Sequence, residues 1–518
     1  MDTKKVLLTD PIKKFMPPKE AKPTERKIYD IQKETLLALQ YIEYAQCREF
    51  QDKTVLAHEL TPKPFFLIDK EGLLRKSDKC LLQKTLIQYL DKDITSGYPS
   101  SDCLMIDFMA NVYTVTAERL QMQETEVTFG HVANLLLLKF LKLGAASKSI
   151  HILFDIYKDS SIKNTERSRR SGKKSAVNVT ITNEHQKFPI DLSRFWCSKS
   201  NKTNFQHFFI HWVMQNYHGE MDVFLGGGLK DKIGVCILVN GSTTVEVPEL
   251  QSFQEEADDR IMFHISYAVD RGAETILVAT KDTDIFICPI YHLTKWTAAG
   301  LKELWFLKGS SKNKQAIPLH QLYGSLPMSL VVVLPALHSL TGCDTTSKIA
   351  TKPAAIKRCL YFEDIQDFGK DRFDTDMLFK AENFLTHCLI ENTNCSTFDE
   401  LRLEEYYKYG RKVDFSKLPC TSESIHLHIQ RSYLQCKIWL DAPHGVNLLN
   451  PLDYGYSETD SGQVTPMLSV ETVKPANLPE PCRCKACARD KSCVCRREAM
   501  PCCKYCKCSS TTCKNPNN

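Results

Sequence analysis

The sequence predicts an α/β protein with a parallel sheet flanked by helices, followed by a helical region and a small cysteine-rich module. Three observations predict this fold class. Short apolar or β-branched runs alternate with amphipathic helical segments between residues 96 and 360. Several of those runs end in an aspartate. Ten of the 22 cysteines lie at or beyond Cys482, which sets the C-terminal part of the chain apart.

Length and composition limit the class of protein. The 518 residues leave room for two or more domains, and 43% hydrophobic with 25% charged residues excludes disorder as the dominant state. Met1 to Lys19 alternates charge and proline, so we expect no secretory signal. The most apolar run, Leu326 to Leu340, is broken by prolines and is shorter than the roughly 20 residues of a membrane span. We therefore expect an intracellular protein without a membrane partner.

Residues 1–95 are predicted to form an N-terminal arm and a small packing region. A lysine- and proline-rich lead precedes a helical segment around Ile31 to Phe50, and the motif His58-Glu59-Leu60 follows. We assign this region no chemistry.

Two strands of the main domain, residues 96–360, are each predicted to end in an acid. The apolar run Leu104 to Phe108 contains Asp107, and Ile150 to Phe154 is followed by Asp155. A single aspartate at a strand end is usually a helix cap or a turn former. Its recurrence favours a shared site, because separate caps need not recur at strand ends.

The stretch from Gln254 to Pro289 is the centre of the prediction. Acids open a helix that ends near Gly272, and the β-branched run Thr275 to Ala279 predicts a buried parallel strand. Asp282 and Asp284 follow that strand, and in an extended backbone both would point the same way.

Two acids of this stretch, Glu256 and Asp258, can share a site only under one geometric condition. They diverge by about 200° on a regular helix, so both reach one cluster only if the helix begins there. A further acid, Asp344, lies at a tight turn marked by Gly342. We interpret the nearby His338 as a packed or hydrogen-bonded histidine rather than a ligand.

The remaining elements of this domain follow from periodicity. Helices are predicted for Val132–Leu143, Asn204–Tyr217 and Ile317–Leu326, and a hairpin for Val235–Val239 with Thr243–Val247.

Acids at the carboxyl ends of parallel strands lie where α/β folds bind ligands. Close carboxylates repel each other unless a cation compensates them, so the cluster indicates a hard divalent ion, Mg²⁺ or Mn²⁺. The alternative is that the acids at the helix start complement the helix dipole and that Asp-Thr-Asp is a turn.

A basic segment lies between Lys158 and Lys174. Seven basic residues face only Asp159 and Glu166 there. The segment is a solvated helix face, a nuclear-import signal, or a phosphate-binding lip beside the acids. The seven are Lys158, Lys163, Arg167, Arg169, Arg170, Lys173 and Lys174.

The ordered acids resemble the PIN-like nucleases of the flap endonuclease and XPG type. The wording of Glu-Glu-Ala-Asp-x-Arg, Asp-Thr-Asp and His-x-Leu-Thr-Gly-Cys-Asp resembles more closely still a large group of mobile-element-like animal proteins. The resemblance covers roughly residues 100 to 360 and implies a metal-dependent nuclease. It implies one metal at Asp107, Asp155, Glu256 and Asp258, and either a second metal or a shared ligand shell at Asp282, Asp284 and Asp344.

The resemblance also implies that Arg169 and Arg170 steer the scissile phosphate. The sequence departs from the family pattern after Asp344. There the segment Ile349 to Pro353 lacks the glycine-rich helix-turn-helix with which the family binds duplex DNA.

The cysteine pattern C-x-C-x₂-C-x₅-C-x-C-x₆-C-C-x₂-C-x-C-x₄-C predicts thiolate-bound zinc, because no secretory signal favours disulfides. It resembles the tesmin-type CXC domain, residues 482–515, in which nine cysteines hold a small zinc cluster. The nine are Cys482, Cys484, Cys487, Cys493, Cys495, Cys502, Cys506, Cys508 and Cys513, and Cys503 is left over.

Basic residues, among them Arg496 and Arg497, interleave with these cysteines and suit phosphate contact. The alternative is a structural zinc knob for protein contact.

Between these domains, residues 361–450 are predicted to be helical and residues 451–481 to form a linker. The helices are expected at Met377–Glu391, Phe398–Tyr409 and Ser424–Leu440. Together the features predict a nuclear, Mg²⁺- or Mn²⁺-dependent nuclease that acts on DNA and is targeted by a zinc module. The alternative function is a catalytically inactive scaffold that binds DNA through the cysteine module.

Overall fold

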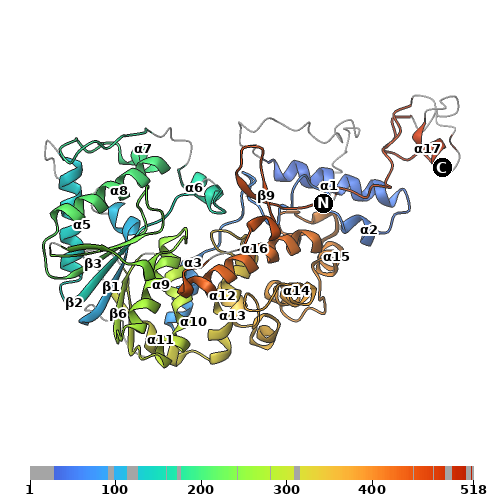
Figure 1. Cartoon of the computed structure of the whole chain (residues 1–518). Coiled ribbons are helices and arrows are strands. Elements are labelled where there is room, and N and C mark those ends of the chain that lie inside the picture. Colours follow the sequence, from blue (N-terminus) through green and yellow to red (C-terminus); the bar gives the residue numbers. More distant parts are fainter. Residues whose placement is uncertain are drawn as a thin grey trace, which may run out of the picture. The chain divides into compact units, whose positions relative to one another are not determined.

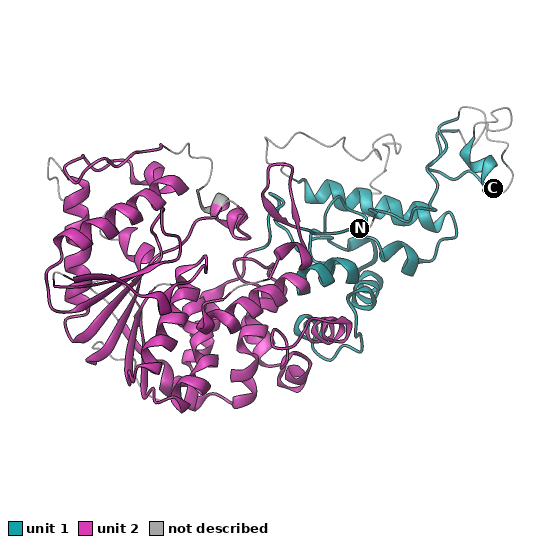
Figure 2. Ribbon diagram, in the orientation of Figure 1, with its two compact units in different colours: residues 1–75, 385–429, 467–518 teal, residues 76–384, 430–466 magenta. Residues whose placement is uncertain are grey.

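The computed structural model describes residues 29–90, 99–113, 127–158, 160–171, 177–241, 243–280, 282–308, 315–446, 449–470, 472–484, 493–508 and 515, without the side chains of residues 168, 170 and 171. The chain divides into two compact units (Figure 2). Unit 1 comprises Met1–Arg75, Leu385–Ile429 and Met467–Asn518, and unit 2 comprises Lys76–Phe384 and Gln430–Pro466.

Unit 2 is built on an eight-stranded sheet with the strand order β5-β4-β3-β2-β1-β6-β7-β8. The pairings β3-β2-β1-β6-β7 are parallel, whereas β4, β5 and β8 run antiparallel to their neighbours at the two edges. The strands are β1 Ser101–Asp107, β2 Ser147–Leu153, β3 Asp222–Gly226, β4 Cys236–Asn240, β5 Thr243–Glu246, β6 Thr275–Ala279, β7 Glu303–Lys308 and β8 Gln315–Pro318. The predicted α/β class is confirmed, and so is the hairpin, which forms β4 and β5.

Helices cover both faces of this sheet (Figure 1). On one face α5 (Phe129–Leu143) and α8 (Lys199–Asn216) pack against alternate strand residues such as Leu104 and Ile106. Successive strand side chains point to opposite faces, so His151 of β2 faces the other side. There its Nδ1 lies 2.9 Å from Nδ1 of His264 in α9 (Ala257–Asp270).

The strand order creates a switch point at β1. The chain adds β2 and β3 on one side of β1 and then returns to the other side with β6 and β7. Connections therefore leave the carboxyl ends of β1 and β6 in opposite directions, and open α/β sheets bind ligands in the crevice formed there. Strand β6 leads into α10 (Asp284–Ala298).

A tight turn follows α12 (Met328–Thr341). Gly342 has φ 117°, and a Cβ there would lie 2.7 Å from the Ser347 carbonyl oxygen, so only glycine fits. The buried Lys352 Nζ donates to the carbonyls of His338 and Gly342 and to Thr341 Oγ1. This turn positions Asp344.

Further elements of unit 2 are α3 (Lys79–Ile87), α6 (Asn164–Ser171), α7 (Leu192–Cys197), α11 (Leu319–Ser325) and α13 (Lys352–Ile356). The segment predicted as a linker contains the antiparallel pair β9 (Tyr456–Glu458) and β10 (Val464–Pro466). Two long helices, α14 (Thr375–Leu389) and α16 (Ser422–Asp441), have residues in both units.

Unit 1 contains α1 (Ile31–Gln46), α2 (Asp52–Leu56), α15 (Phe398–Tyr409) and α17 (Val494–Arg497). Its interior is organised by the buried Arg402, whose guanidinium donates to the carbonyls of Leu56, His58, Glu59 and Pro419. The Glu59 carboxylate accepts from the Thr421 backbone N–H. The motif His58-Glu59-Leu60 therefore ties together segments that lie far apart in the sequence.

Within the described part of the chain, no single helix has the length and hydropathy to cross a membrane, and only the pair α11 and α12, bent by 115°, meets both conditions together.

Candidate functional site

Aspartates from separate parts of unit 2 converge at the switch point. Asp107 ends β1, and its carboxylate accepts from the Ala110 N–H at 3.1 Å and from Thr280 Oγ1 at 3.2 Å. The same Thr280 hydroxyl accepts from the backbone N–H of Asp282 at 3.2 Å. Thr280 thus links the end of β1 to the end of β6.

Asp155 fixes the start of α9 in this cluster. Its Oδ1 accepts from the Ala257 N–H at 2.9 Å, and its Oδ2 accepts from the Tyr157 hydroxyl at 3.0 Å. Glu256 is the N-cap of α9, so the helix begins where the sequence argument required. The strand-end aspartate is both a helix cap and a member of the shared site, because the helix that it caps carries further acids.

The pair Asp282 and Asp284 is brought together by a turn rather than by an extended strand. Asp284 is the first residue of α10, and its backbone N–H donates to Asp282 Oδ1 at 2.9 Å. Carboxylate oxygens of Asp258, Asp282 and Asp284 all lie within 4.8 Å of one another. Three hard oxygen ligands at this separation fit a divalent ion such as Mg²⁺ or Mn²⁺.

The electrostatics of the acids agree with a cation site. Burial, then the charges of Asp155 and Asp282, raises the pKa of Asp107 to about 7. Burial, then Asp282 and Asp107, raises the pKa of Asp258 well above its ordinary value. Among the described residues no lysine, arginine or histidine pairs with Asp107, Asp155 or Asp258. Without an ion these acids therefore retain protons near neutral pH, and a divalent cation would displace those protons and offset the charge of the carboxylates.

The other side of the cluster already contacts a cation. Lys79, the first residue of α3, places its Nζ 2.9 Å from Asp284, 2.9 Å from Asp344 and 3.7 Å from Asp282. A lysine at a helix N-terminus opposes the helix dipole, so the carboxylates are what stabilise it there. These three acids are the set for which the resemblance implied a second metal.

His338 also contacts this side. Its Nε2 lies 2.9 Å from Asp284 Oδ1, and its ring stacks on Trp439 at 5.1 Å between centroids. Burial lowers the pKa of His338 to about 4, so the neutral ring donates to the carboxylate. Burial raises the pKa of Asp284, but Lys79 and His338 outweigh it and hold that pKa well below the ordinary range. His338 is thus both packed and hydrogen-bonded, and its hydrogen bond orients the Asp284 carboxylate.

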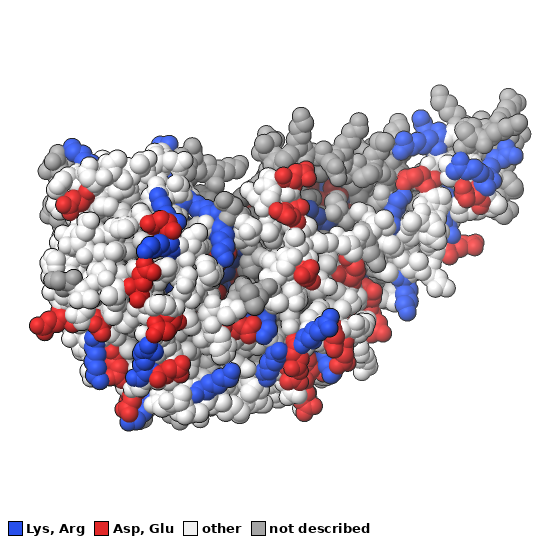
Figure 3. All heavy atoms as spheres, in the orientation of Figure 1, with Lys and Arg blue, Asp and Glu red and all other residues white. Residues whose placement is uncertain are grey.

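The basic segment contributes two residues to the acids. Lys163 Nζ lies 3.0 Å from Glu256, and Arg167 bridges Glu255 and Glu256 at 2.6 Å each. Burial raises the pKa of Glu256, but Lys163 and Arg167 outweigh burial and lower it. On the face of unit 2 shown in Figure 3, lysine and arginine side chains lie interspersed with acidic side chains.

The structure distributes the other predicted basic residues differently. Arg169 pairs with Glu166 at 3.7 Å, on its own helix α6. The side chain of Arg170, and all of Lys173 and Lys174, lie outside the described residues. Among the side chains that the structure describes, Lys163 and Arg167 pair with Glu255 and Glu256, whereas the resemblance singled out Arg169 and Arg170.

A second candidate metal site is the cysteine cluster of unit 1. Sulfurs of two overlapping groups lie within 4.8 Å of one another, and both groups share Cys482 and Cys502. Shared sulfurs suit bridging thiolates of a multi-zinc cluster. The groups are Cys482, Cys493, Cys495, Cys502 and Cys482, Cys502, Cys506, Cys508.

The remaining predicted zinc ligands either lie next to these two groups or fall outside the described residues. The Cys484 sulfur lies 3.5 Å from that of Cys482. Cys503, the residue left over from the nine, packs at the edge with its sulfur 4.0 Å from Cys506. Cys487 and Cys513 lie outside the described residues.

The cysteine cluster is docked on α1 and the residues that follow it. The buried Arg48 guanidinium donates to the sulfurs of Cys495 at 2.8 Å and Cys506 at 3.4 Å. Tyr505 hydrogen-bonds to Glu43. Tyr505 thus has a partner within unit 1.

Sequence reasoning missed Lys79 and Arg48. Both lie in the segment to which no chemistry was assigned, and each acts through contacts with residues 200 or more positions away. A lone lysine or arginine carries no local pattern, so only the folded chain reveals it.

No protein-family model matches this chain, and no curated protein matches it.

Proposed function

We propose that this protein is a divalent-metal-dependent nuclease that hydrolyses phosphodiester bonds in DNA, with a zinc-bound cysteine module as its targeting element. The observation that carries the proposal is the convergence of Asp107, Asp155, Asp258, Asp282 and Asp284 at the sheet's switch point. The order of these acids, which resembles that of PIN-like nucleases, supports the same reading. DNA as substrate makes the nucleus the proposed compartment.

The basic residues beside the acids suit a phosphate. A bound Mg²⁺ or Mn²⁺ would lower the pKa of a water and offset charge on the attacked phosphate. Lys163 and Arg167, now paired with Glu255 and Glu256, can exchange those carboxylates for phosphate oxygens, which the arginine fork matches. Before substrate binds, the carboxylates of Glu255 and Glu256 hold Lys163 and Arg167 in place beside the aspartates.

The cysteine module contributes DNA affinity in this proposal. Arg496 and Arg497 lie on α17, close in sequence to Cys493 and Cys495 of the cysteine cluster. Sequence-independent phosphate contact by such residues holds a nuclease near DNA.

The test uses labelled single-stranded, flap and duplex DNA with Mg²⁺ or Mn²⁺. Asp258→Asn removes a ligand at the first turn of α9, and Asp270→Asn makes the same charge change at the exposed end of the same helix. We expect wild type and Asp270→Asn to cleave, and Asp258→Asn to be slower by about 100-fold or more, since even outer partners of metal ligands contribute about 10- to 100-fold. Equal cleavage by the two variants would overturn the proposal.

One observation favours the alternative function, a DNA-binding scaffold without catalysis. Lys79 neutralises part of the acidic cluster with no metal, as a protein that had lost its ions would require. This alternative predicts that the full chain binds DNA, that zinc removal abolishes the binding, and that Mn²⁺ does not bind in unit 2. Mn²⁺ bound in wild type but not in Asp258→Asn argues against it.

A further inference from the structure

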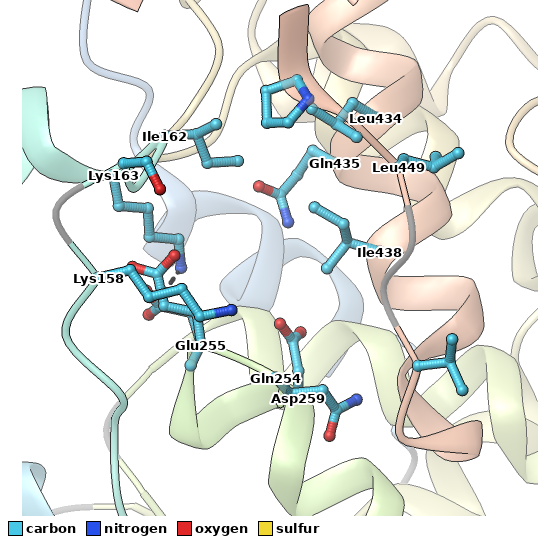
Figure 4. Close-up of a pocket in the computed structure, with 14 residues that line it drawn as sticks. Lys158, Ile162, Lys163, Gln254, Glu255, Asp259, Leu434, Gln435, Ile438 and Leu449 are labelled. Carbon is cyan, nitrogen blue, oxygen red and sulfur yellow. Dashed lines mark ion pairs between the residues drawn. The ribbon is translucent and has the colours of Figure 1, made fainter. Parts of the chain in front are cut away.

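A cavity beside the acidic cluster has the properties of a nucleobase site (Figure 4). It lies within unit 2 and is bordered by the loop after β2, the start of α9, the second half of α16 and the segment that follows α16. Its volume is about 200 Å³, below the roughly 300 to 1,000 Å³ of sites for drug-sized ligands. The cavity therefore suits one flat ring system rather than a larger ligand.

One wall of the cavity is apolar. Leu434 and Ile438 of α16 form it together with Leu449 and Ile162, and these side chains belong to one packed cluster. Leu434 is only 1% exposed, and the other three side chains are partly buried against the same cluster. Enzymes that take a base out of its stack hold it between apolar or aromatic side chains of this kind.

The opposite side presents a buried hydrogen-bond acceptor. Asp259 is 6% exposed, borders the cavity, and its carboxylate accepts no hydrogen bond and makes no ion pair within the described part of the chain. Hydrogen-bond donors from a ligand would stabilise a carboxylate at this depth. The cavity is where donors from a ligand can reach it.

A buried donor accompanies the acceptor. Gln435 is 3% exposed and points into the cavity in Figure 4. Its Oε1 accepts from Thr345 Oγ1 at 2.8 Å, which turns the amide nitrogen away from Thr345. That nitrogen donates to no described residue. It is also not one of the fully buried polar atoms that lack a hydrogen-bond partner. Because Gln435 borders the cavity, we infer that this nitrogen is available to a ligand there. Gln254, in contrast, is used by Ser252 and the Ala442 carbonyl.

The cavity shares residues with the ion pairs that lie beside the aspartates of the proposed metal site. Glu255, Glu256 and Lys163 border it, and they are the residues that form the ion pairs at the acidic cluster. A nucleotide whose phosphate meets Lys163 would therefore present its own base to the cavity.

We propose that this cavity binds one unstacked base of the nucleic acid, and that guanine is the base it prefers. The inference rests on the proposed nuclease function. The Watson–Crick edge of guanine carries two adjacent N–H donors beside a carbonyl acceptor. The Asp259 carboxylate can accept both donors, and the Gln435 amide can donate to the carbonyl oxygen. Adenine, cytosine and thymine each lack the pair of adjacent donors.

The first test measures binding without cleavage. The full-length protein is titrated calorimetrically with dGMP, dAMP, dCMP, dTMP and inorganic phosphate, without added divalent cation. Bidentate recognition predicts that dGMP binds about 10-fold or more tightly than the other nucleotides. Equal affinity for all four nucleotides, or for phosphate alone, overturns the proposal without any variant.

Matched variants then locate the base. Gln435→Met keeps the side-chain length and removes the amide, and Gln251→Met makes the same change at an exposed position of unit 2. Asp259→Asn replaces one acceptor with a donor. We expect the dGMP preference to fall at least about 5-fold in Gln435→Met and in Asp259→Asn, and to persist in Gln251→Met. A preference unchanged in both cavity variants overturns the assignment.

A final arm separates this inference from the proposed function. Single-stranded oligonucleotides that differ only in the position of one guanine are cleaved with Mg²⁺, and we expect the cut to move with the guanine. Selective dGMP binding without any DNA cleavage would remove the nuclease and leave a free-nucleotide site. Cleavage that ignores guanine would keep the nuclease and remove the base site.

Discussion

Replacement of Asp107 with asparagine is expected to stabilise unit 2 in the absence of metal while it impairs metal binding. The Asp107 carboxylate is half-buried and faces the carboxylates of Asp155 and Asp282, which raise its pKa to about 7 after the larger effect of burial. The folded chain therefore holds a proton that the unfolded chain has released at neutral pH. Stability falls as pH rises from about 4 to about 7, where the penalty is complete.

The magnitude follows from the two pKa values. A folded value of about 7 against an ordinary 3.8 corresponds to about 4 kcal/mol at 1.36 kcal/mol per pKa unit. Asparagine keeps one acceptor, so one of the two hydrogen bonds from Ala110 and Thr280 is lost, at about 1 kcal/mol. We expect a net gain of about 2–3 kcal/mol at pH 8 and none near pH 4.

Hydrogen exchange of the β1 amides is the suitable assay, because a chain with two compact units need not unfold in one step. At pH 8 without divalent ions, exchange in Asp107→Asn should be slower than in wild type by about 30- to 150-fold. The difference should shrink toward pH 5 and reverse with saturating Mg²⁺, which stabilises only wild type. Asp270→Asn is the control. Faster exchange in metal-free Asp107→Asn at pH 8 would refute the electrostatic reasoning.

Three further predictions concern buried cations. Arg402→Met should lower the free energy of unfolding of unit 1 by about 3–5 kcal/mol, because it leaves Glu59 and several carbonyls buried without their donor. Chemical denaturation measures this change, and an effect below about 1 kcal/mol would contradict the prediction. Arg48→Met should release zinc to a chelating dye about 10-fold faster, with Arg48→Lys intermediate, because the guanidinium donates to two cluster sulfurs; identical release rates would exclude the role. Lys79→Met should tighten Mn²⁺ binding about 10-fold in a spectroscopic titration, because it removes a cation that competes for Asp284 and Asp344; unchanged affinity would mean that the lysine and the ion occupy different positions.

The acidic cluster was accessible to sequence reasoning for a topological reason. Acids that follow predicted parallel strands must gather at one edge of the sheet, whichever way the strands are ordered. Asp107, Asp155 and Asp282 satisfied this rule, and the condition that α9 begin at Glu256 is met because Asp155 caps the helix there. The relation between Asp282 and Asp284 was not accessible, because the backbone turns into α10 between them.

The basic segment shows what a sequence pattern cannot predict, namely which of several like-charged residues contact the acids. All seven basic residues have the same charge, and the sequence offers no means to rank them. In the described structure Lys163 and Arg167 meet Glu255 and Glu256, whereas Arg169 pairs on its own helix. The direction in which α6 faces decides which side chains reach the site.

The sequence by itself determined the α/β class, the strand-end acids and the cysteine cluster, because each depends on periodicity or spacing along the chain. Tertiary structure alone decided where the compensating charges lie. Lys79 reaches Asp284 across 205 positions and Arg48 reaches Cys495 across 447, and neither has a local signature. The cavity between α9 and α16 also depends on tertiary structure. No sequence pattern marks Asp259 or Gln435, and only the folded chain brings both to the lining of one cavity. Charge and hydrogen-bond complementarity act through space, so they become visible only after distant segments meet.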